Sequence, residues 1–192
     1  MEKGNYISTI LRSQQTVFSA KDIMLLWGEA SSDAVRVRIS YYAKSGDLYR
    51  IRRGFYAKDK DYNKFELATK IFTPSYMSFE TVLGQAGITF QHYNRIFAAS
   101  YVTREITADG QVYSYKRIKD AILTNPAGIE SKNNYSIATP ERAFLDVVYL
   151  NKDYHFDNLS PLNWDKVFEI LPSYGGNKRM EKTVKKYHES IL

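Results

Sequence analysis

The side chains best suited to chemistry in this sequence lie between residues 32 and 53. Arginine can donate two parallel hydrogen bonds to guanine, serine adapts to several base edges, and an exposed valine can contact a thymine methyl group. Arginines on a hairpin are suited to holding phosphates. The residues of this stretch that are candidates for DNA binding are Ser32, Arg36, Val37, Ser40, Tyr41, Lys44, Arg50, Arg52 and Arg53.

The positive charge of the chain is concentrated in the same region. Residues 1–58 contain ten lysines and arginines against five aspartates and glutamates, a net charge of +5 out of +6 for all 192 residues. A basic segment beside a nearly neutral remainder favours a polyanionic partner, most often nucleic acid. The alternative is a basic surface that is merely solvated.

Residue types that serve catalysis or metal binding are sparse. His92, His155 and His188 have no spacing suited to a metal, and the chain has no cysteine for a disulfide or a zinc–thiolate site. No P-loop, dinucleotide fingerprint or nucleophile elbow occurs. We therefore expect a protein that is not an enzyme, with no catalytic, cofactor-binding or metal-binding residue.

One carboxylate has a position that could be chemical. Asp146 lies in an apolar segment, where a buried carboxylate can be catalytic. An ion pair with Arg142, four residues earlier, is the simpler expectation. A nuclease, the less favoured alternative, would need a second carboxylate and a lysine beside Asp146.

The elements that must position the candidate DNA-binding residues begin with a short helix. Asn5 can cap it, and Ile7, Ile10 and Leu11 have the spacing of one buried stripe. We therefore expect these three side chains to face a core.

The start of the second helix is marked more clearly. Ser19 as N-cap and Asp22 three residues later form a short capping box, which Phe18 and Ile23 flank as a hydrophobic staple. Gly28 ends the helix. The run GEAS then leaves a turn of about three or four residues before the next helix, as in a helix-turn-helix.

The third helix is expected to begin at a cap formed by Ser31 or Ser32 and to end at Gly46. At about 100° per residue, Val35, Ile39 and Tyr42 share the side that faces the core. The outer side then carries Arg36, Val37, Ser40, Tyr41 and Lys44. This outer face has the mixture of side chains that base edges require.

A hairpin comes directly after this helix in the sequence KSGDLYRIRRGFYAK, residues 44–58. We expect strands at Asp47–Arg52 and Phe55–Ala57, with Gly54 in the turn. The alternation of aliphatic and charged residues is not clean, so a bend or an edge position must separate them. We interpret the arginines as phosphate contacts; the alternative is protection of an edge strand by charge.

The pattern predicts an α+β fold, with an N-terminal winged helix-turn-helix at residues 1–58 followed by a mixed α/β C-terminal domain at residues 59–192. A unit of about 58 residues is marginal alone and should dock on the C-terminal domain. The polar junction KDKDYNK, residues 58–64, agrees with docking. No apolar run approaches the ~20 residues that span a bilayer, so we expect a cytoplasmic protein without a membrane partner.

The second domain is expected to mix helices and strands. Helices are predicted at 65–72, from a cap at Ser78 to Gly87, from a cap at Thr139 with Pro140 as the first residue, at 165–171 and at 178–191. The apolar residues of the helix after Thr139 are Ala143, Phe144, Val147, Val148 and Leu150, and we expect it to be buried. Strands are expected in residues 95–118, with a hairpin turn at Asp109-Gly110. The tyrosines of QVYSYKR could stack on bases, although cross-strand packing is favoured.

Together, SGDLYRIRRGFYA after a helix-turn-helix, ELATKIFTPSYMSFETVLGQAGI, YSYKRI and IATPERAFLDVVYL make residues 6–150 resemble the abortive-infection AbiEi antitoxins and related regulators of type IV toxin-antitoxin systems. The resemblance implies a transcriptional repressor whose winged helix binds inverted repeats of double-stranded DNA in its own promoter, as a monomer or a dimer. It also implies a nucleotidyltransferase-like toxin as a partner. Only the helix-turn-helix and hairpin positions acquire a role from it. The alternatives are a regulator without antitoxin activity and a module that binds an acidic protein.

Overall fold

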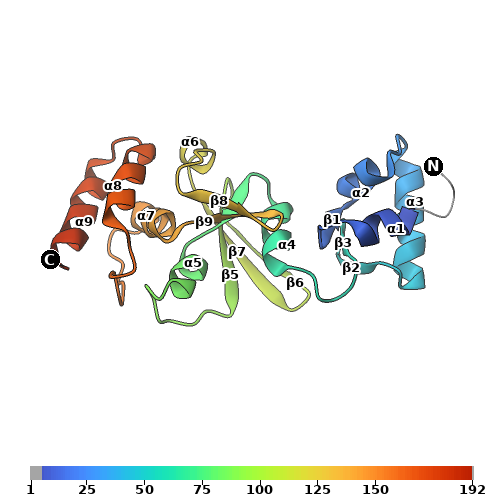
Figure 1. Cartoon of the computed structure of the whole chain (residues 1–192), viewed down its shortest axis with the longest axis horizontal. Helices are drawn as coiled ribbons and strands as arrows, with labels where there is room; N and C mark the ends of the chain where they lie inside the picture. The colour runs from blue at the N-terminus through green and yellow to red at the C-terminus, as the bar shows by residue number, and fades with distance from the viewer. Residues whose placement is uncertain (1–5, 192) are drawn as a thin grey trace.

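The computed structural model describes residues 6–191, so the expected cap at Asn5 lies outside the described residues. Within this range the chain is mixed α+β, with nine α-helices, one 3₁₀ helix and two sheets. It is elongated, with one unit of helices and a small sheet at one end, a six-stranded sheet in the middle and helices α8 and α9 at the other end (Figure 1). No helix in the described range has both the length and the apolar character of a membrane span.

Residues 6–58, here called the first unit, contain three helices and three short strands. These are α1 (Tyr6–Arg12), β1 (Val17–Ser19), α2 (Ala20–Trp27), α3 (Ser32–Ser45), β2 (Tyr49–Arg52) and β3 (Phe55–Ala57). The expected hairpin is present as β2 and β3. Strand β1, which we did not predict, pairs antiparallel with β3 and gives the sheet the order β1-β3-β2.

The first unit has a small core of its own. It comprises the buried side chains of Ile10, Phe18, Ile23, Trp27, Val35, Ile39 and Leu48. The prediction for Leu11 was wrong, because its side chain is 52% exposed. Helix α1 has only seven residues. Since each residue turns the helix by about 100°, the stripe that buries Ile10 turns Leu11 away.

The helix boundaries of the first unit follow the predicted caps. The Ser19 and Asp22 side chains each accept a hydrogen bond from the other residue's backbone N–H, at 3.1 and 2.9 Å. Ser31 caps α3 by accepting from the N–H of Ala34. Gly28 and Gly46 end α2 and α3 with φ values of 62° and 86°, where glycine has no steric cost.

Residues 59–191, here called the second unit, are built on the six-stranded sheet with the order β6-β7-β5-β4-β9-β8. Its strands are β4 (Ser75–Met77), β5 (Arg95–Ser100), β6 (Arg104–Ala108), β7 (Gln111–Arg117), β8 (Ile129–Lys132) and β9 (Tyr135–Ala138). The β4–β9 and β5–β7 pairs are parallel and the others antiparallel. The predicted turn at Asp109-Gly110 is confirmed, with positive φ at both residues.

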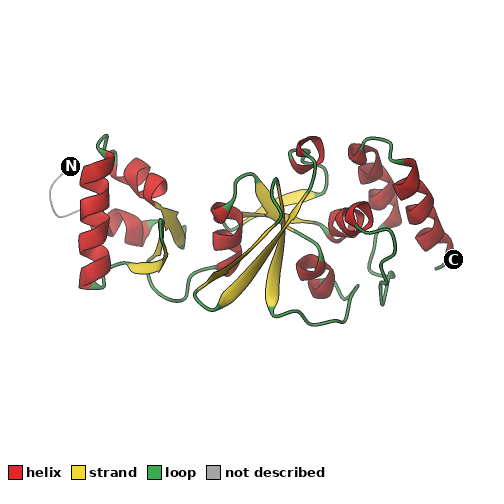
Figure 2. Cartoon of the chain, turned by 180° about the vertical axis from the view of Figure 1, so that it is seen from behind, coloured by secondary structure: helices red, strands yellow, loops and turns green. Residues whose placement is uncertain are grey.

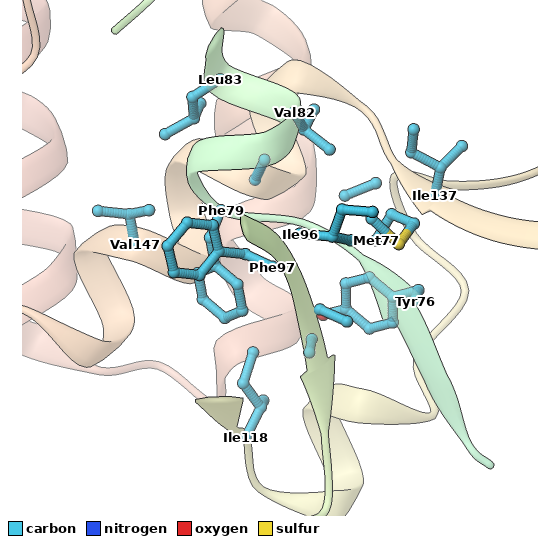
Figure 3. Close-up of a cluster of buried hydrophobic side chains, with 14 of the residues drawn as sticks. Tyr76, Met77, Phe79, Val82, Leu83, Ile96, Phe97, Ile118, Ile137 and Val147 are labelled. Carbon is cyan, nitrogen blue, oxygen red and sulfur yellow. The ribbon is translucent and has the colours of Figure 1, made fainter. Parts of the chain in front are cut away.

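Helices pack on this sheet and extend beyond it (Figure 2). They are α4 (Lys64–Ile71), α5 (Glu80–Gln85), α6 (Asp120–Leu123), α7 (Pro140–Leu150), α8 (Trp164–Ile170), a 3₁₀ helix (Leu171–Tyr174) and α9 (Lys178–Glu189). The core lies between β4, β5, β9 and helices α5 and α7, where Met77, Phe97 and Val147 are among the buried side chains (Figure 3). Tyr113 and Tyr115 are buried too, which agrees with the favoured interpretation as packing residues and leaves neither ring exposed to stack on bases.

Helix α7 is buried along most of its length, as expected from its apolar residues. Thr139 caps it by accepting a hydrogen bond from the N–H of Arg142, and Pro140 is its first residue. Leu150, at its end, is an exception and is 38% exposed. The core therefore closes over α7 before its last residue.

The predicted cap at Ser78 was wrong. Phe79 occupies the N-cap position of α5, and the Ser78 hydroxyl instead donates a 2.7 Å hydrogen bond to Oδ2 of Asp146. Both residues are fully buried. A buried carboxylate without hydrogen-bond donors is costly, and this requirement decides the direction of the Ser78 side chain.

The first unit docks on the second through one face of its small sheet. Val17 of β1, Ile51 of β2 and Ala57 of β3 belong to the core of the second unit. Polar contacts surround them: the backbone N–H and the hydroxyl of Thr16 both donate to Oε2 of the buried Glu66, at 2.9 and 2.7 Å. The docking expected for so small a unit is therefore present.

Candidate nucleic-acid interface

Helix α3 presents one face to the small core and the other to solvent. Val35 and Ile39 are 1% exposed, and the short turn between Gly28 and Ser31 sets the angle at which α3 leaves α2. The candidates on α3 are all exposed: Ser32, Arg36, Val37, Ser40, Tyr41 and Lys44. The structure therefore brings these six residues to one solvent-facing surface.

Arg36 has only a loose partner on this surface. Its Nη1 lies 3.4 Å from Oδ1 of Asp33, and the two side chains are 73% and 88% exposed. An ion pair in solvent is weak and easily exchanged. Its neighbour Val37 is 72% exposed, with nothing apolar to cover it. Both side chains are thus free to contact a ligand.

Arg38 shows how a structural arginine of the same helix differs. Its guanidinium carbon lies 3.9 Å from the ring centroid of Tyr6, and its Nη1 lies 3.1 Å from Oε2 of Glu29. This side chain holds α3 against α1 and the turn after α2. Arg38 is therefore separate from the exposed candidates, as its position around the helix requires.

The hairpin contains a β-bulge that changes the face on which the Arg52 side chain lies. Arg50 pairs with Tyr56, whereas Arg52 pairs with Phe55, so Ile51 is the extra residue. After the bulge Arg52 shares the face of Phe55 that packs against the second unit. The uneven alternation of aliphatic and charged residues in this hairpin predicted such a local irregularity.

The surroundings of Arg52 agree with this placement. Its Nη1 is buried, and its positive charge acts on Tyr115 of the second unit, where it opposes the rise in the tyrosine pKa that burial causes. Arg52 is half-buried. One end of the Arg52 guanidinium therefore faces the inside of the protein, which makes Arg52 less accessible to a phosphate than the exposed Arg50 and Arg53.

Arg50 and Arg53 remain on the outside of the hairpin. Both are exposed, and within residues 6–191 no salt bridge engages either of them or Lys44. Exposed cations without a carboxylate partner in that range give this side of the first unit a positive potential.

Lys21 is a candidate that sequence reasoning missed. It is exposed in the first turn of α2 and lines a cavity of about 280 Å³ together with Met24, Ser32 and Arg36. The signal that could have found it is its place at the start of the first helix of a helix-turn-helix, which crosses the DNA backbone in such proteins.

Asp22, the residue after Lys21, has a structural role. Partial burial alone would raise the pKa of Asp22, but the N–H of Ser19 and the ammonium of Lys70 outweigh it and leave the pKa below 3.8. Lys70 Nζ lies 2.9 Å from Oδ2 of Asp22. The start of α2 is thereby fixed both by its cap and by helix α4.

Asp146 lies at the centre of a buried polar cluster. Hydroxyls of Tyr76, Ser78 and Tyr174 donate to its carboxylate, and Nε of Arg142 lies 3.4 Å from Oδ1. Burial raises the pKa of Asp146, and Arg142 with the three hydroxyls acts against that rise. The expected pair with Arg142 is confirmed, and both side chains are fully buried.

This cluster has the contacts of a structural site. Arg142 also donates to the carbonyl oxygens of Ile122 and Ala127, and so ties α7 to the segment after α6. The described residues contain no group of three or more histidine, aspartate or glutamate side chains placed to hold a metal ion.

The chain was compared with models of known protein families and with curated proteins. No family model matches it, and no curated protein is significantly similar to it. The interpretation of the interface therefore rests on the chain's own residues.

Proposed function

We propose that the first unit is a winged helix-turn-helix that binds double-stranded DNA, with α3 in a major groove and the β2–β3 hairpin beside the phosphates. The order α1-β1-α2-α3-β2-β3 supports this, because a helix-turn-helix is followed directly by a hairpin. Arg36, Val37 and Ser40 would select bases, while Arg50, Arg53 and Lys44 would hold phosphates.

The observation that carries this proposal is the solvent-facing side of α3. Val37 and Tyr41, which are 72% and 65% exposed, lie there beside Arg36, whose only ion pair is a loose one in solvent. In a major groove the valine would meet thymine methyl groups and the cations would meet acceptors. Contact with DNA explains both kinds of side chain together.

We further propose that the chain represses transcription by occupying inverted repeats in its own promoter, and that it acts as the antitoxin of a nucleotidyltransferase-like toxin. The support is the resemblance to AbiEi antitoxins in residues 6–150. If two copies bind an inverted repeat, the half-sites should lie about 34 Å apart or a multiple of that distance.

Footprinting on the DNA upstream of the gene tests the DNA proposal. We expect protection that weakens steeply with salt, because phosphate contacts release counterions. Arg36→Ala should reduce discrimination between operator and random DNA. Arg104→Ala, which removes an exposed arginine of β6, serves as the matched control and should change neither. Absence of protection at low salt would contradict the proposal and favour a module that binds an acidic protein.

Co-expression with the product of the adjacent gene tests the antitoxin proposal separately. We expect the chain to relieve growth inhibition by that product. Unchanged toxicity, with footprinting intact, would leave a DNA-binding regulator without antitoxin activity.

A further inference from the structure

A cavity of about 620 Å³ lies in the second unit, between α5, the start of β5 and the loop of residues 89–94. A second cavity, of about 310 Å³, lies on the other side of this loop and shares Thr89, Phe90, Gln91 and Tyr93 with the first. Their volumes are in the range of small-molecule sites. Neither cavity contains a residue of the first unit, so a ligand bound there would not depend on contact with DNA.

One wall of the larger cavity is kept open by Gly84, next to the last residue of α5. Its φ is not positive, and a Cβ added there would meet nothing closer than the carbonyl oxygen of Thr89, at 4.0 Å. Alanine would therefore fit, and it is a better helix former than glycine. Neither backbone conformation nor packing accounts for the glycine, whereas an open wall does.

Thr89 provides a polar group that has no partner among the described residues. Its side chain is 4% exposed and lines both cavities, yet its Oγ1 makes no hydrogen bond within residues 6–191. An unpaired buried hydroxyl is costly. A ligand in either cavity would supply the partner that this hydroxyl lacks.

Aromatic rings gather at the same place. Phe90 is 70% exposed, although its backbone N–H is anchored by a 2.7 Å hydrogen bond to Oδ2 of Asp157. Tyr93 and His92 line the larger cavity beside it. An exposed ring on an anchored backbone is suited to stacking against a flat ligand.

Each of the two charged residues that line the larger cavity, Glu80 and Arg95, forms an ion pair with a residue of opposite charge. Both carboxylate oxygens of Glu80 accept from Nζ of Lys116 at 3.0 Å, and Nη1 of Arg95 lies 2.7 Å from Oε2 of Glu105. The Gln91 carboxamide oxygen accepts a 2.7 Å hydrogen bond from the hydroxyl of Tyr93, so the carboxamide of Gln85 remains for recognition. A carboxamide forms a paired set of hydrogen bonds with the edge of adenine.

We propose that this cavity binds an uncharged purine ring of the adenine type. The ring stacks on Phe90 over the open wall at Gly84, and its polar edge meets Thr89 and a glutamine carboxamide. The same ring could belong to a free nucleoside or to a base of a single strand.

Calorimetric titration of the full chain with adenosine, guanosine, cytidine and uridine, each up to about 1 mM, tests the proposal. We expect adenosine to bind most tightly. An oligoadenylate of about four nucleotides forms the second arm: tighter binding than adenosine indicates a strand as the source, and equal binding a free nucleoside. Binding of none of these probes, or tighter binding of the pyrimidines, would overturn the proposal.

Variants connect the binding to the cavity. Phe90→Ala and Thr89→Val should each weaken adenosine binding about tenfold. Gly84→Phe should abolish it, whereas Gly84→Ala should preserve the fold and confirm that the glycine is not required for it. Tyr101→Ala, which truncates a partly exposed ring of another loop, is the control and should change nothing.

Phe90→Ala keeps the test decisive if Gly84→Phe does not fold, because an exposed ring contributes little to folding. Adenosine binding that survives both Phe90→Ala and Thr89→Val unchanged would place the ligand elsewhere and overturn the proposal.

Discussion

The outer face of α3 and the buried cluster around Asp146 use the same chemistry in opposite ways. Arg36 and Asp33 form a pair whose side chains are 73% and 88% exposed, whereas both members of the Arg142–Asp146 pair are fully buried. Solvent makes the first pair weak and exchangeable, while the second is held by hydroxyls and carbonyl groups from several elements. Charges on the outer face of α3 are therefore free for a partner, and those of the cluster are committed to the fold.

The largest test of this contrast is Asp146→Asn. It leaves the charge of Arg142 buried without a counterion, so we expect the free energy of unfolding to fall by about 3–5 kcal/mol. Urea denaturation measures it, with Asp33→Asn as the matched control. Removing the exposed carboxylate should change stability by less than about 0.5 kcal/mol. Similar losses in the two variants would show that the pairs do not differ as their burial indicates.

Glu66→Gln tests a charged side chain in a third environment, the contact between the two units. Glu66 is fully buried and accepts two hydrogen bonds from Thr16, with Nζ of Lys70 3.7 Å away. We expect a loss of about 2 kcal/mol, since hydrogen bonds to a charged group are worth about 1.5–3 kcal/mol. Amide hydrogen exchange at Thr16 should become faster while exchange in β5 and β7 stays slow. Equal acceleration everywhere would mean that the units do not open separately.

Arg52 and Arg53 extend the comparison of buried and exposed charges to two adjacent residues of the hairpin. Arg53→Ala should lower the slope of log affinity against log salt by about 1, because an exposed phosphate contact is lost. Arg52→Ala should leave that slope unchanged and lower stability by about 1 kcal/mol, because its guanidinium lies against the second unit. DNA titrations at several salt concentrations measure the slope. A lower slope in Arg52→Ala alone would reverse the assignment of the two residues.

Local signals in the sequence predicted much of the fold. The capping box of Ser19 and Asp22, the cap at Thr139 and the turn at Asp109-Gly110 each depend on two to four neighbouring residues, so their geometry follows from the sequence nearby. The outward face of α3 was predictable for the same reason, since helical periodicity is local.

Long-range contacts explain the features that were missed. Strand β1 has three residues and pairs with β3 about forty residues later, beyond the reach of local patterns. The direction of Arg52 depends on a bulge at Ile51, and that of Ser78 on Asp146, 68 residues away. In the candidate interface, the outward-facing residues of α3 were thus predictable from periodicity, while the directions of the hairpin arginines depend on the bulge.

The smallest expected effect is a change in how the free energy of unfolding depends on pH, and it arises from Asp22 at the start of α2. The pKa of Asp22 lies below its unfolded value of 3.8, so the ionised carboxylate stabilises the folded state above that pH, and this contribution disappears as the pH falls through the lower folded pKa. Asp22→Asn should therefore flatten the fall in stability between about pH 5 and pH 2, by less than about 1 kcal/mol because the group is partly exposed. A stability curve that Asp22→Asn leaves unchanged would mean that Lys70 and the cap stabilise this carboxylate no more than solvent does, and the distinction between committed and free charges would then fail within the first unit itself.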